Sequence, residues 1–356
     1  MKNVRVIVDL QFGSTGKGLI AGYLAEKYPC DTVVAAWRPN AGHTYIDLLD
    51  RKFIHTMLPN GIVSPKLERI MIGPEAVINA EALQRETEEA EKLLGVELFS
   101  KIIIHANAAV VQEQHRTDER KLVAIGSTMK GSAEAVIDKM RRDPKGIATA
   151  GQNPGALGPR LAGRVFTADF YDFKLDTAHN IQVEGAQGFS LGMNQRFYPY
   201  STSRECTATQ ILSDCAIPRS FGKVSVIGTL RTFPIRVANR FDADGKQVGT
   251  SGPGYPDQEE ITFHSIGQPV ELTTVTKLPR RIFTFSDNQL FDAVRASAPD
   301  FLFLNFLNYL PVGERADFLA RVNEVSEAAG GGPVRWTGTG PAYDGVTEQE
   351  RFNVRL

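Results

Sequence analysis

A glycine-rich segment near the amino terminus has the residue types of a phosphate-binding loop. It is Gly13-Ser14-Thr15-Gly16-Lys17-Gly18, between an apolar run and a helical pattern. Glycines let the backbone turn tightly and point N–H groups at an anion at a helix N-terminus, and Lys17 adds a point charge for a β- or γ-phosphate. The spacing is not that of the Walker pattern, so the segment alone leaves a purely structural turn as an alternative.

Three further loops place glycines beside polar side chains, each after a run typical of a strand. They are Asn40-Ala41-Gly42-His43-Thr44, Ile125-Gly126-Ser127-Thr128 and Glu184-Gly185-Ala186-Gln187-Gly188. Ligands of open α/β sheets bind outside the carboxyl ends of the strands, where such loops meet. The four loops together predict a nucleotide site at that edge, with His43 as a group that titrates near neutrality.

The elements that must position these loops alternate between strands and helices. Apolar and β-branched runs predict strands, and amphipathic stretches predict helices. The predicted strands span 4–10, 32–37, 101–105, 181–184, 224–228 and 301–304, and the predicted helices span 17–27, 80–94 and 134–142. This alternation indicates an α/β fold with a mostly parallel central sheet flanked by helices and a P-loop-like phosphate loop.

The chain has 356 residues, which suits two domains or one large one. No internal repeat or low-complexity tract divides it, and we expect a single domain over 1–356 with an insertion-like polar loop at about 241–257. That loop contains Asp242-Ala243-Asp244-Gly245, which resembles the start of a calcium loop but lacks its final Glu. The segment therefore predicts a hairpin turn.

Charge and cysteine content exclude several classes of protein. With 40 Lys and Arg against 41 Asp and Glu, the net charge is -1, which is not the basic field that nucleic-acid binding requires. No apolar run approaches the roughly 20 residues of a membrane span. The 3 cysteines form no CxxC pair, which argues against a disulfide framework or a structural zinc site. We therefore expect a cytoplasmic enzyme without nucleic-acid or membrane partners.

The chain resembles the adenylosuccinate synthetase family in the motifs QFGSTGKG, NAGHT, IGST, VEGAQG and YPYSTS, in that order. TTVTKLPRR and TGTGP extend the resemblance, which runs from residue 3 to 344. Members of this family transfer the γ-phosphate of a nucleoside triphosphate to O6 of a 6-oxopurine nucleotide. The amino group of aspartate then displaces the 6-phosphoryl group. The resemblance implies the same fold, a carbon–nitrogen ligase activity and one Mg²⁺ per subunit.

The first loop departs from the family pattern at one position. The family has QWGDEGKG, whose Asp takes the purine N1 proton and binds Mg²⁺, whereas this chain has Ser14. A serine hydroxyl cannot be that base because its pKa lies far above neutrality. Guanylate carries an amine at C2 where inosinate has hydrogen, so the shorter Ser14 leaves room for the amine and can accept its hydrogen bond. The variant resembles the phage branch of the family, which acts on dGMP and leads to 2,6-diaminopurine in phage DNA.

A second departure concerns the nucleoside triphosphate. The family recognises GTP with the Asp of a TKLD segment that follows a buried strand, and the corresponding segment here is Asn305-Phe306-Leu307-Asn308. An amide offers both a donor and an acceptor, as adenine requires. We therefore expect ATP or dATP as co-substrate, with an Asn that only caps the strand as the structural alternative.

The resemblance implies a role for each matching position. The implied catalytic residues are Ser14, Lys17, His43 and Gln187, with His43 acting on the transferring phosphoryl group. The triphosphate is expected to bind Gly13, Ser14, Thr15, Gly16, Lys17 and Gly18, and its base to lie among Asn305, Asn308, Gly338, Thr339, Gly340 and Pro341. The dGMP site is expected to comprise Ser14, Asn40, Ala41, Ser127, Thr128, Gln187 and Thr202. The implied aspartate loop contains Thr274, Thr276, Lys277, Arg280 and Arg281, and the implied Mg²⁺ ligands are Ser14 and the carbonyl of Gly42.

Arg142 lies fourteen residues after Thr128, where the family's phosphate-binding arginine comes from the neighbouring subunit. The resemblance therefore implies a homodimer with composite dGMP sites, in the host cytoplasm if the protein is phage-encoded. Two other functions stay open: an ordinary adenylosuccinate synthetase that acts on IMP, and an inactive nucleotide-binding homologue that has lost its base. A P-loop nucleotide kinase is disfavoured by the missing Walker spacing.

Overall fold

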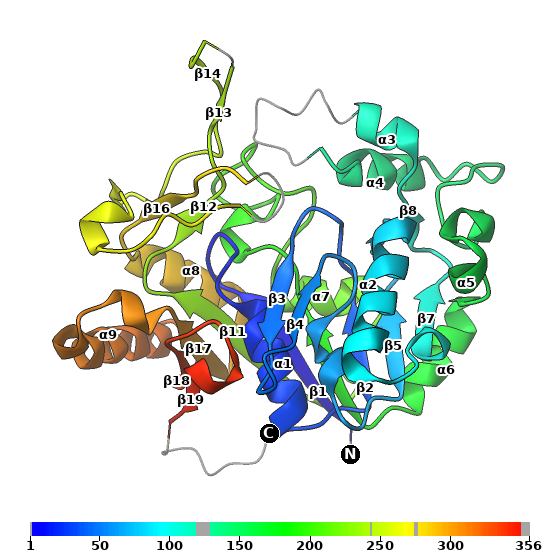
Figure 1. The fold of residues 1–356 in the computed structure, drawn as a ribbon, viewed down its shortest axis with the longest axis horizontal. Helices are drawn as coiled ribbons and strands as arrows, with labels where there is room; N and C mark the ends of the chain where they lie inside the picture. The colour runs from blue at the N-terminus through cyan, green and yellow to red at the C-terminus, as the bar shows by residue number, and fades with distance from the viewer. Residues whose placement is uncertain (1, 119–128, 243, 274–276, 350–356) are drawn as a thin grey trace.

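The computed structural model describes residues 2–118, 129–242, 244–273 and 277–349. Its central sheet comprises β1 (Asn3–Asp9), β2 (Thr32–Ala35), β5 (Arg69–Ile72), β7 (Ile102–His105), β9 (Val165–Phe166), β10 (Asn180–Glu184), β11 (Lys223–Arg231), β17 (Phe301–Asn305), β18 (Val334–Gly338) and β19 (Val346–Glu348). The order across the sheet is β19-β18-β17-β11-β1-β10-β2-β5-β7-β9 (Figure 1). The strand pairs are parallel except β18–β19. The predicted α/β class is therefore confirmed.

Helices flank this sheet (Figure 1). They are α1 (Lys17–Lys27), α2 (Ala80–Leu94), α3 (Glu113–Asp118), α4 (Ser132–Arg141), α5 (Pro159–Ala162), α6 (Ala168–Asp176), α7 (Ala208–Asp214), α8 (Asp287–Ser297) and α9 (Arg315–Ala328). Helices α1 and α2 begin and end where the amphipathic pattern predicts. Within the described ranges, no helix combines the length and the apolar character needed to cross a membrane.

Smaller sheets surround the carboxyl edge of the central sheet. They are formed by β3 (His43–Ile46) with β4 (Lys52–His55), β6 (Val77–Ile78) with β8 (Ala109–Val110), β13 (Arg240–Phe241) with β14 (Gln247–Gly249), and β12 (Ile235–Arg236) with β16 (Arg281–Phe283) and β15 (Glu260–Ile261). The turn between β13 and β14 confirms the predicted hairpin. There the N–H of Gly245 donates to the carbonyl of Asp242 (3.1 Å). Ala243 lies outside the described residues.

The core lies around the central strands, and β1 is buried along almost its whole length. Val6, Ile7 and Val8 have no exposed surface, as expected for a parallel strand covered on both faces. Strand β11 continues to Arg231, three residues beyond the predicted end at Gly228, because Thr229, Leu230 and Arg231 pair with β17. Gly228, Thr229 and Arg231 interrupt the apolar run, so the sequence pattern ended too early. The expectation of one domain over 1–356 stays a prediction.

Candidate active site

The carboxyl ends of β2, β10, β1 and β11 lie side by side and surround a cavity of about 410 Å³. Three of the four predicted glycine loops meet there, and the fourth, with Ser127 and Thr128, lies outside the described residues. Eleven predicted site residues line the cavity: Gly13, Ser14, Gly16, Lys17, Gly18, Asn40, Ala41, Gly42, His43, Gln187 and Arg280. The structure thus brings Gly13 and Arg280 to the same cavity, although they lie about 270 residues apart in the sequence.

The phosphate loop turns sharply through three residues with positive φ. These are Gly13 (88°), Ser14 (57°) and Gly16 (93°), and Gly16 is also the N-cap of α1. A β-carbon on Gly16 would lie 2.1 Å from the side-chain nitrogen of Asn305, so this position requires glycine. Ser14 tolerates a backbone conformation that most side chains avoid, and its side chain is exposed. The loop therefore presents a neutral hydroxyl to solvent at its tip.

A buried carboxylate, that of Asp9, organises this loop from below. Its side chain accepts hydrogen bonds from the backbone N–H groups of Gln11 (2.9 Å) and Gly13 (3.1 Å) and from the hydroxyl of Thr15. It also forms a fully buried ion pair with Lys17 (2.8 Å). Our sequence reasoning missed Asp9, although an acidic residue at the end of an apolar strand, directly before a glycine loop, is a usable signal.

Lys17 lies between that carboxylate and a second loop. Its ammonium group donates to Asp9 and to the backbone carbonyl of Gln187, each at 2.8 Å, while the residue lines the cavity. Gln187 has a positive φ of 64°, which turns its carbonyl toward the lysine. The ammonium group is therefore fixed at the wall of the cavity before any phosphate arrives.

His43 begins β3 and is buried at the cavity wall. Its ring packs edge-on against Trp37, with the centroids 4.1 Å apart, and its Nδ1 has no hydrogen-bond partner among the described residues. Burial, followed by the charges of Lys17 and His55, holds the pKa of His43 well below its ordinary value. The imidazole is therefore neutral at pH 7 and carries one N–H donor.

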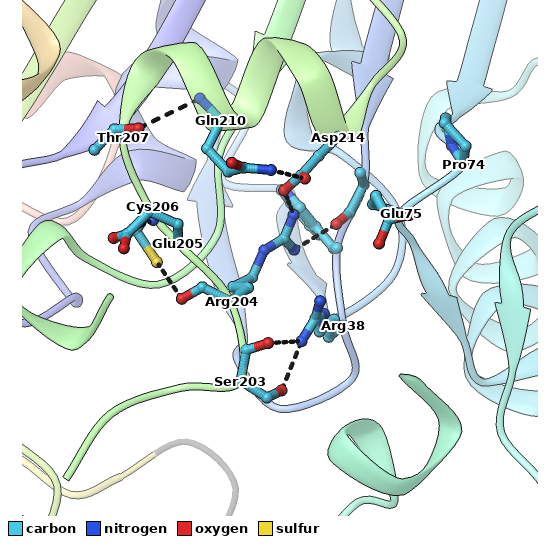
Figure 2. Close-up of polar contacts among 12 residues, drawn as sticks. Arg38, Pro74, Glu75, Ser203, Arg204, Glu205, Cys206, Thr207, Gln210 and Asp214 are labelled. Carbon is cyan, nitrogen blue, oxygen red and sulfur yellow. Dashed lines mark hydrogen bonds and ion pairs between the residues drawn. The ribbon is translucent and has the colours of Figure 1, made fainter. Parts of the chain in front are cut away.

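Asn40 and Gln187 bring two loops into direct contact, because the amide of Gln187 donates to the side-chain oxygen of Asn40 (3.1 Å). Figure 2 shows the polar contacts of Arg38, two residues before Asn40, and of Arg204. Arg38 donates to the carbonyl (2.7 Å) and hydroxyl (2.6 Å) of Ser203, and Arg204 donates to the carbonyl of Ala36 (2.6 Å) and binds Asp214. These contacts hold Ser203, the neighbour of Thr202, against the segment that leads into the Asn40 loop.

A further ion pair, between a buried arginine and a partly buried glutamate, contacts the phosphate loop through the backbone of Ser14. Arg231 has no exposed side-chain surface, and its guanidinium group binds both carboxylate oxygens of Glu271 and donates to the carbonyl of Ser14 (3.2 Å). Of the described residues that line the cavity, Glu271 alone carries a carboxylate. No sequence motif pointed to either residue.

The remaining predicted residues lie around the cavity or outside the described chain. Asn305 faces the phosphate loop from behind, where its amide donates to the carbonyl of Thr15 (3.2 Å) and a β-carbon on Gly338 would touch it. Arg281 is turned away from the cavity and binds Glu260 (2.6 Å) and the carbonyl of Gly252 (2.6 Å). Thr274 and Thr276 lie outside the described residues. Arg142, Lys277, Asn308, Thr339 and Pro341 are exposed, and Thr202 and Gly340 are partly buried.

No group of three or more His, Cys, Asp or Glu side chains suited to a metal ion occurs in the described part of the chain. Residues with oxygen ligands for Mg²⁺ that line the cavity include Ser14, Gly42 and Glu271, and Arg231 and Tyr309 already bind the carboxylate of Glu271. This sparse set of hard oxygen atoms fits Mg²⁺, which commonly takes most of its remaining ligands from substrate phosphates and water.

The Asp9–Lys17 pair generates a prediction. We expect Asp9→Asn to lower the free energy of unfolding by about 3 kcal/mol, because the ammonium group of Lys17 then lacks its buried counter-charge. The turnover of the folded variant should fall more than about tenfold as Lys17 loses its position. Chemical denaturation and a phosphate-release assay measure the two effects.

The control for this variant is Asp47→Asn. Asp47 is also a buried carboxylate that accepts two backbone N–H groups and binds an arginine, Arg51, but it lies in the β3–β4 turn. It should lose stability and keep the turnover of the folded enzyme. Wild-type turnover in folded Asp9→Asn would show that Lys17 does not depend on this carboxylate.

Known proteins agree with this arrangement. The profile described as adenylosuccinate synthetase matches residues 6–151. The N6-succino-2-amino-2'-deoxyadenylate synthase of Salmonella phage PMBT28 is 47% identical over 97% of both chains. The succinoaminodeoxyadenylate synthetase of cyanophage S-2L, solved with dGMP and dATP, matches with a TM-score of 0.87 and 40% identity, over 98% of this chain and 95% of that one. The adenylosuccinate synthetase of Plasmodium falciparum shares the fold, with a TM-score of 0.79 and 18% identity over 98% of this chain and 100% of that one. The chain belongs to the adenylosuccinate synthetase family, alongside its phage N6-succino-2-amino-2'-deoxyadenylate synthases.

Proposed function

We propose that this protein is a carbon–nitrogen ligase that joins L-aspartate to C6 of dGMP, with ATP or dATP as the phosphoryl donor. The product is 2-amino-2'-deoxyadenylosuccinate, a precursor of the 2,6-diaminopurine nucleotide. The observation that carries the proposal is Ser14, an exposed neutral side chain on the cavity wall where the family's usual loop has Asp. The names of the phage relatives and the dGMP and dATP in the cyanophage structure support it.

The reaction takes two displacements. In the first, O6 of dGMP attacks the γ-phosphorus, the bond to the β,γ-bridging oxygen breaks, and the N1 proton leaves. In the second, the amino group of aspartate attacks C6, inorganic phosphate departs with the C6–O6 electron pair, and the new nitrogen loses a proton. The sum consumes one nucleoside triphosphate and yields the nucleoside diphosphate and phosphate.

For the first step the protein supplies positive charge and hydrogen-bond donors. Lys17 and the backbone N–H groups at the start of α1 face the triphosphate, where charge on the β,γ-bridge builds up in the transition state. His43 is neutral and buried, so its N–H can donate to the transferring phosphoryl group without an opposing desolvation cost. The negative charge of a triphosphate would also favour the protonated imidazole, which makes His43 an acid when it is needed.

The acceptor nucleotide fits the neutral wall formed by Ser14, Asn40, Ala41 and Gln187. A short hydroxyl at position 14 can accept from the 2-amino group of guanine, and the joined amides of Asn40 and Gln187 offer both donors and acceptors. We assign the dGMP 5'-phosphate to Ser127, Thr128 and Thr202. The buried hydroxyl of Thr202 has no partner among the described residues and is available for this role.

The donor nucleotide extends from the phosphate loop toward Phe306, which also lines the cavity. We place its base between Asn308, which is exposed, and the segment Gly338-Thr339-Gly340-Pro341. Asn305 supports the loop from behind, so its contribution to triphosphate binding is indirect. An exposed amide at Asn308 suits adenine, in agreement with the dATP of the cyanophage structure.

Mg²⁺ would be held by the Ser14 hydroxyl, the Gly42 carbonyl and the phosphates of the donor. When bound, it neutralises charge on the β- and γ-phosphates. Lys17 and the loop N–H groups then orient the γ-phosphate toward O6.

L-Aspartate is assigned to residues 274–281, in which Arg280 lines the cavity and Lys277 is exposed nearby in sequence. Burial lowers the pKa of Arg280 to about 10, so the guanidinium group is still protonated at neutral pH and can bind a carboxylate. Arg281 binds Glu260 and would have to leave that ion pair to contact aspartate. We therefore assign the main carboxylate contact to Arg280 and keep Lys277, Thr274 and Thr276 as further ligands.

We further propose that the enzyme is a homodimer that works in the cytoplasm, where its nucleotide and amino-acid substrates are made. Arg142 supports the dimer because it is exposed in a left-handed conformation at the end of α4 and does not line the cavity of its own chain. An arginine in this position can complete the phosphate site of a neighbouring subunit. Exposed Ile137, Met140 and Ile147 on and after α4 offer an apolar surface for that contact.

A substrate matrix tests the proposed function directly. Phosphate release is measured over IMP, GMP and dGMP, crossed with ATP, dATP and GTP, with and without L-aspartate. We expect aspartate-dependent turnover with dGMP and an adenine nucleotide. Turnover of IMP at the same rate would identify an ordinary adenylosuccinate synthetase, and no turnover with any combination would identify an inactive homologue.

Ser14→Asp tests why the acceptor is dGMP. We expect dGMP turnover to fall about 10²-fold, roughly 2.7 kcal/mol, because the longer side chain crowds the 2-amino group. Ser14→Asn is the matched variant, since it has the same shape without the charge and tolerates the positive φ equally well. If crowding decides, both variants lose dGMP activity; dGMP activity that survives in both would refute the steric explanation.

The missing base generates a prediction about the order of events. Ser14 cannot hold the N1 proton, so we propose that the carboxylate of bound aspartate takes it, directly or through a water on Ser14. Positional isotope exchange of the β,γ-bridging oxygen of labelled ATP should then require aspartate, or succinate, which has the carboxylates but no amine. Exchange at the turnover rate with dGMP and Mg-ATP alone would contradict this assistance.

Arg142→Ala tests the composite site. It should raise the dGMP Michaelis constant more than about tenfold, the loss of a charge-assisted contact. Mixing it with Lys17→Ala should restore part of the activity, because one hybrid site then has both residues. Arg141→Ala is the control, since Arg141 is the neighbouring exposed arginine and binds Asp138. No recovery in subunits shown to exchange would place Arg142 in its own chain's site.

A further inference from the structure

Arg231 connects three segments of the site through one guanidinium group. It ends β11, has no exposed side-chain surface, and its backbone N–H and carbonyl are both bound by the amide of Gln11 (2.9 and 3.1 Å). Its guanidinium group binds Glu271, donates to the carbonyl of Ser14 (3.2 Å), and lies 3.8 Å from the centre of the Phe306 ring. The phosphate loop, the segment that carries Glu271 and the donor-base segment therefore share one buried cation.

Glu271 begins the first of two described segments, 271–273 and 277–280, that pair with each other and that we together call the aspartate hairpin. The backbone N–H of Arg280 donates to the carbonyl of Glu271 (2.9 Å), Leu272 pairs with Pro279, and the N–H of Thr273 donates to the carbonyl of Leu278 (2.8 Å). Arg280, at the end of the second segment, lines the cavity. The position of the Glu271 side chain therefore fixes where Arg280 enters the site.

The donor side of the cavity is connected to the same carboxylate. Phe306 has a positive φ of 59° and lines the cavity with its ring against Arg231. Tyr309, three residues later, donates its hydroxyl to Glu271 (2.9 Å). A nucleotide base that packs near Phe306 would restrict the motion of its ring. Because the ring packs on Arg231 and Arg231 binds Glu271, the motion of the aspartate hairpin would be restricted as well.

We propose that the Arg231–Glu271 pair positions the aspartate hairpin against the phosphate loop and the donor-base segment, so that the donor nucleotide and aspartate strengthen each other's binding. Both are positioning residues, and the inference rests on the proposed function. A ligand that orders one of three segments joined by a buried ion pair lowers the entropic cost of ordering the other two. The resulting coupling is reciprocal, so it appears in the affinity of either ligand.

A role for Glu271 as the missing proton acceptor is the competing explanation, since its carboxylate lines the cavity. Burial would raise its pKa, but the charge and hydrogen bonds of Arg231 and the hydroxyl of Tyr309 outweigh burial and hold the pKa below its ordinary value. Both oxygens are occupied by these donors. A carboxylate that is stabilised in its charged form is a poor base, so positioning is the role that fits its contacts.

The test measures the dissociation constant of L-aspartate by calorimetry, with dGMP present, with and without a non-hydrolysable ATP analogue. For the wild type we expect the analogue to tighten aspartate binding at least about fivefold, within the usual range for coupled sites. Glu271→Gln should reduce this factor below about twofold and raise the aspartate Michaelis constant, while the dGMP Michaelis constant changes little. Glu271→Asp, which keeps the charge, should recover part of the coupling.

Tyr309→Phe keeps the test decisive if Glu271→Gln does not fold, because it removes only one hydrogen bond and should lower the coupling factor partially. The matched control is Glu348→Gln. Glu348 also joins a buried arginine, Arg335, to a tyrosine hydroxyl, that of Tyr28, but on the edge strand β19 away from the cavity. This control should keep the wild-type coupling.

An unchanged coupling factor in both Glu271→Gln and Tyr309→Phe, or no coupling in the wild type, would overturn the inference. Failure of the proposed function has a different signature, since wild-type enzyme would then release no phosphate with dGMP, aspartate and an adenine nucleotide. If the wild type turns over dGMP but the variants keep the wild-type coupling factor, only the positioning role is overturned.

Discussion

The carboxylate of Asp9 lies below the site and shapes it without facing the cavity. A buried charge is tolerated only when it is paired and its oxygen atoms are hydrogen-bonded, and the groups seen to satisfy Asp9 lie between Gln11 and Lys17. The electrostatic requirement of one side chain therefore dictates the course of the backbone from Gln11 to Lys17. It also fixes the ammonium group of Lys17 between Asp9 and the Gln187 carbonyl. The other loops of the site are built against this arrangement.

A buried carboxylate with hydrogen-bonded oxygen atoms occurs again in a neighbouring strand, below the cavity. Glu184 is buried at the end of β10, and its carboxylate accepts from the backbone N–H groups of Asn60 (2.9 Å) and Gly61 (2.7 Å). Its backbone carbonyl accepts from the indole N–H of Trp37, which packs on His43. Ser14, Asn40 and Gln187, which line the cavity and to which we assign the purine, carry no charge. A neutral wall of this kind can donate to and accept from a ligand without the desolvation cost of a further buried charge.

Local patterns in the sequence predicted the elements that depend on local forces. The amphipathic repeat placed α1 and α2, and glycine beside polar residues placed three loops at one sheet edge. Ion pairs between residues that are far apart in the sequence leave no such local pattern. Arg231 and Glu271 are separated by 40 residues. Arg281 forms an ion pair with Glu260, which the antiparallel pairing of β15 and β16 brings close to it. Residue type alone cannot tell an arginine that binds substrate from one that binds its own sheet.

The support for Ser14 explains how its side chain can differ from the family pattern without disturbing the loop. Its positive φ is held by neighbours, since Asp9 binds the N–H of Gly13 and Arg231 binds the Ser14 carbonyl. The side chain itself makes no contact that the loop needs, and it is exposed at the tip. A position whose backbone is fixed by others can exchange a carboxylate for a hydroxyl at little cost in stability. Under the proposed function the chemical consequence is large, because the exchange removes the family's base and opens space at C2 of the purine. Acceptor choice and proton transfer would then change together at one residue.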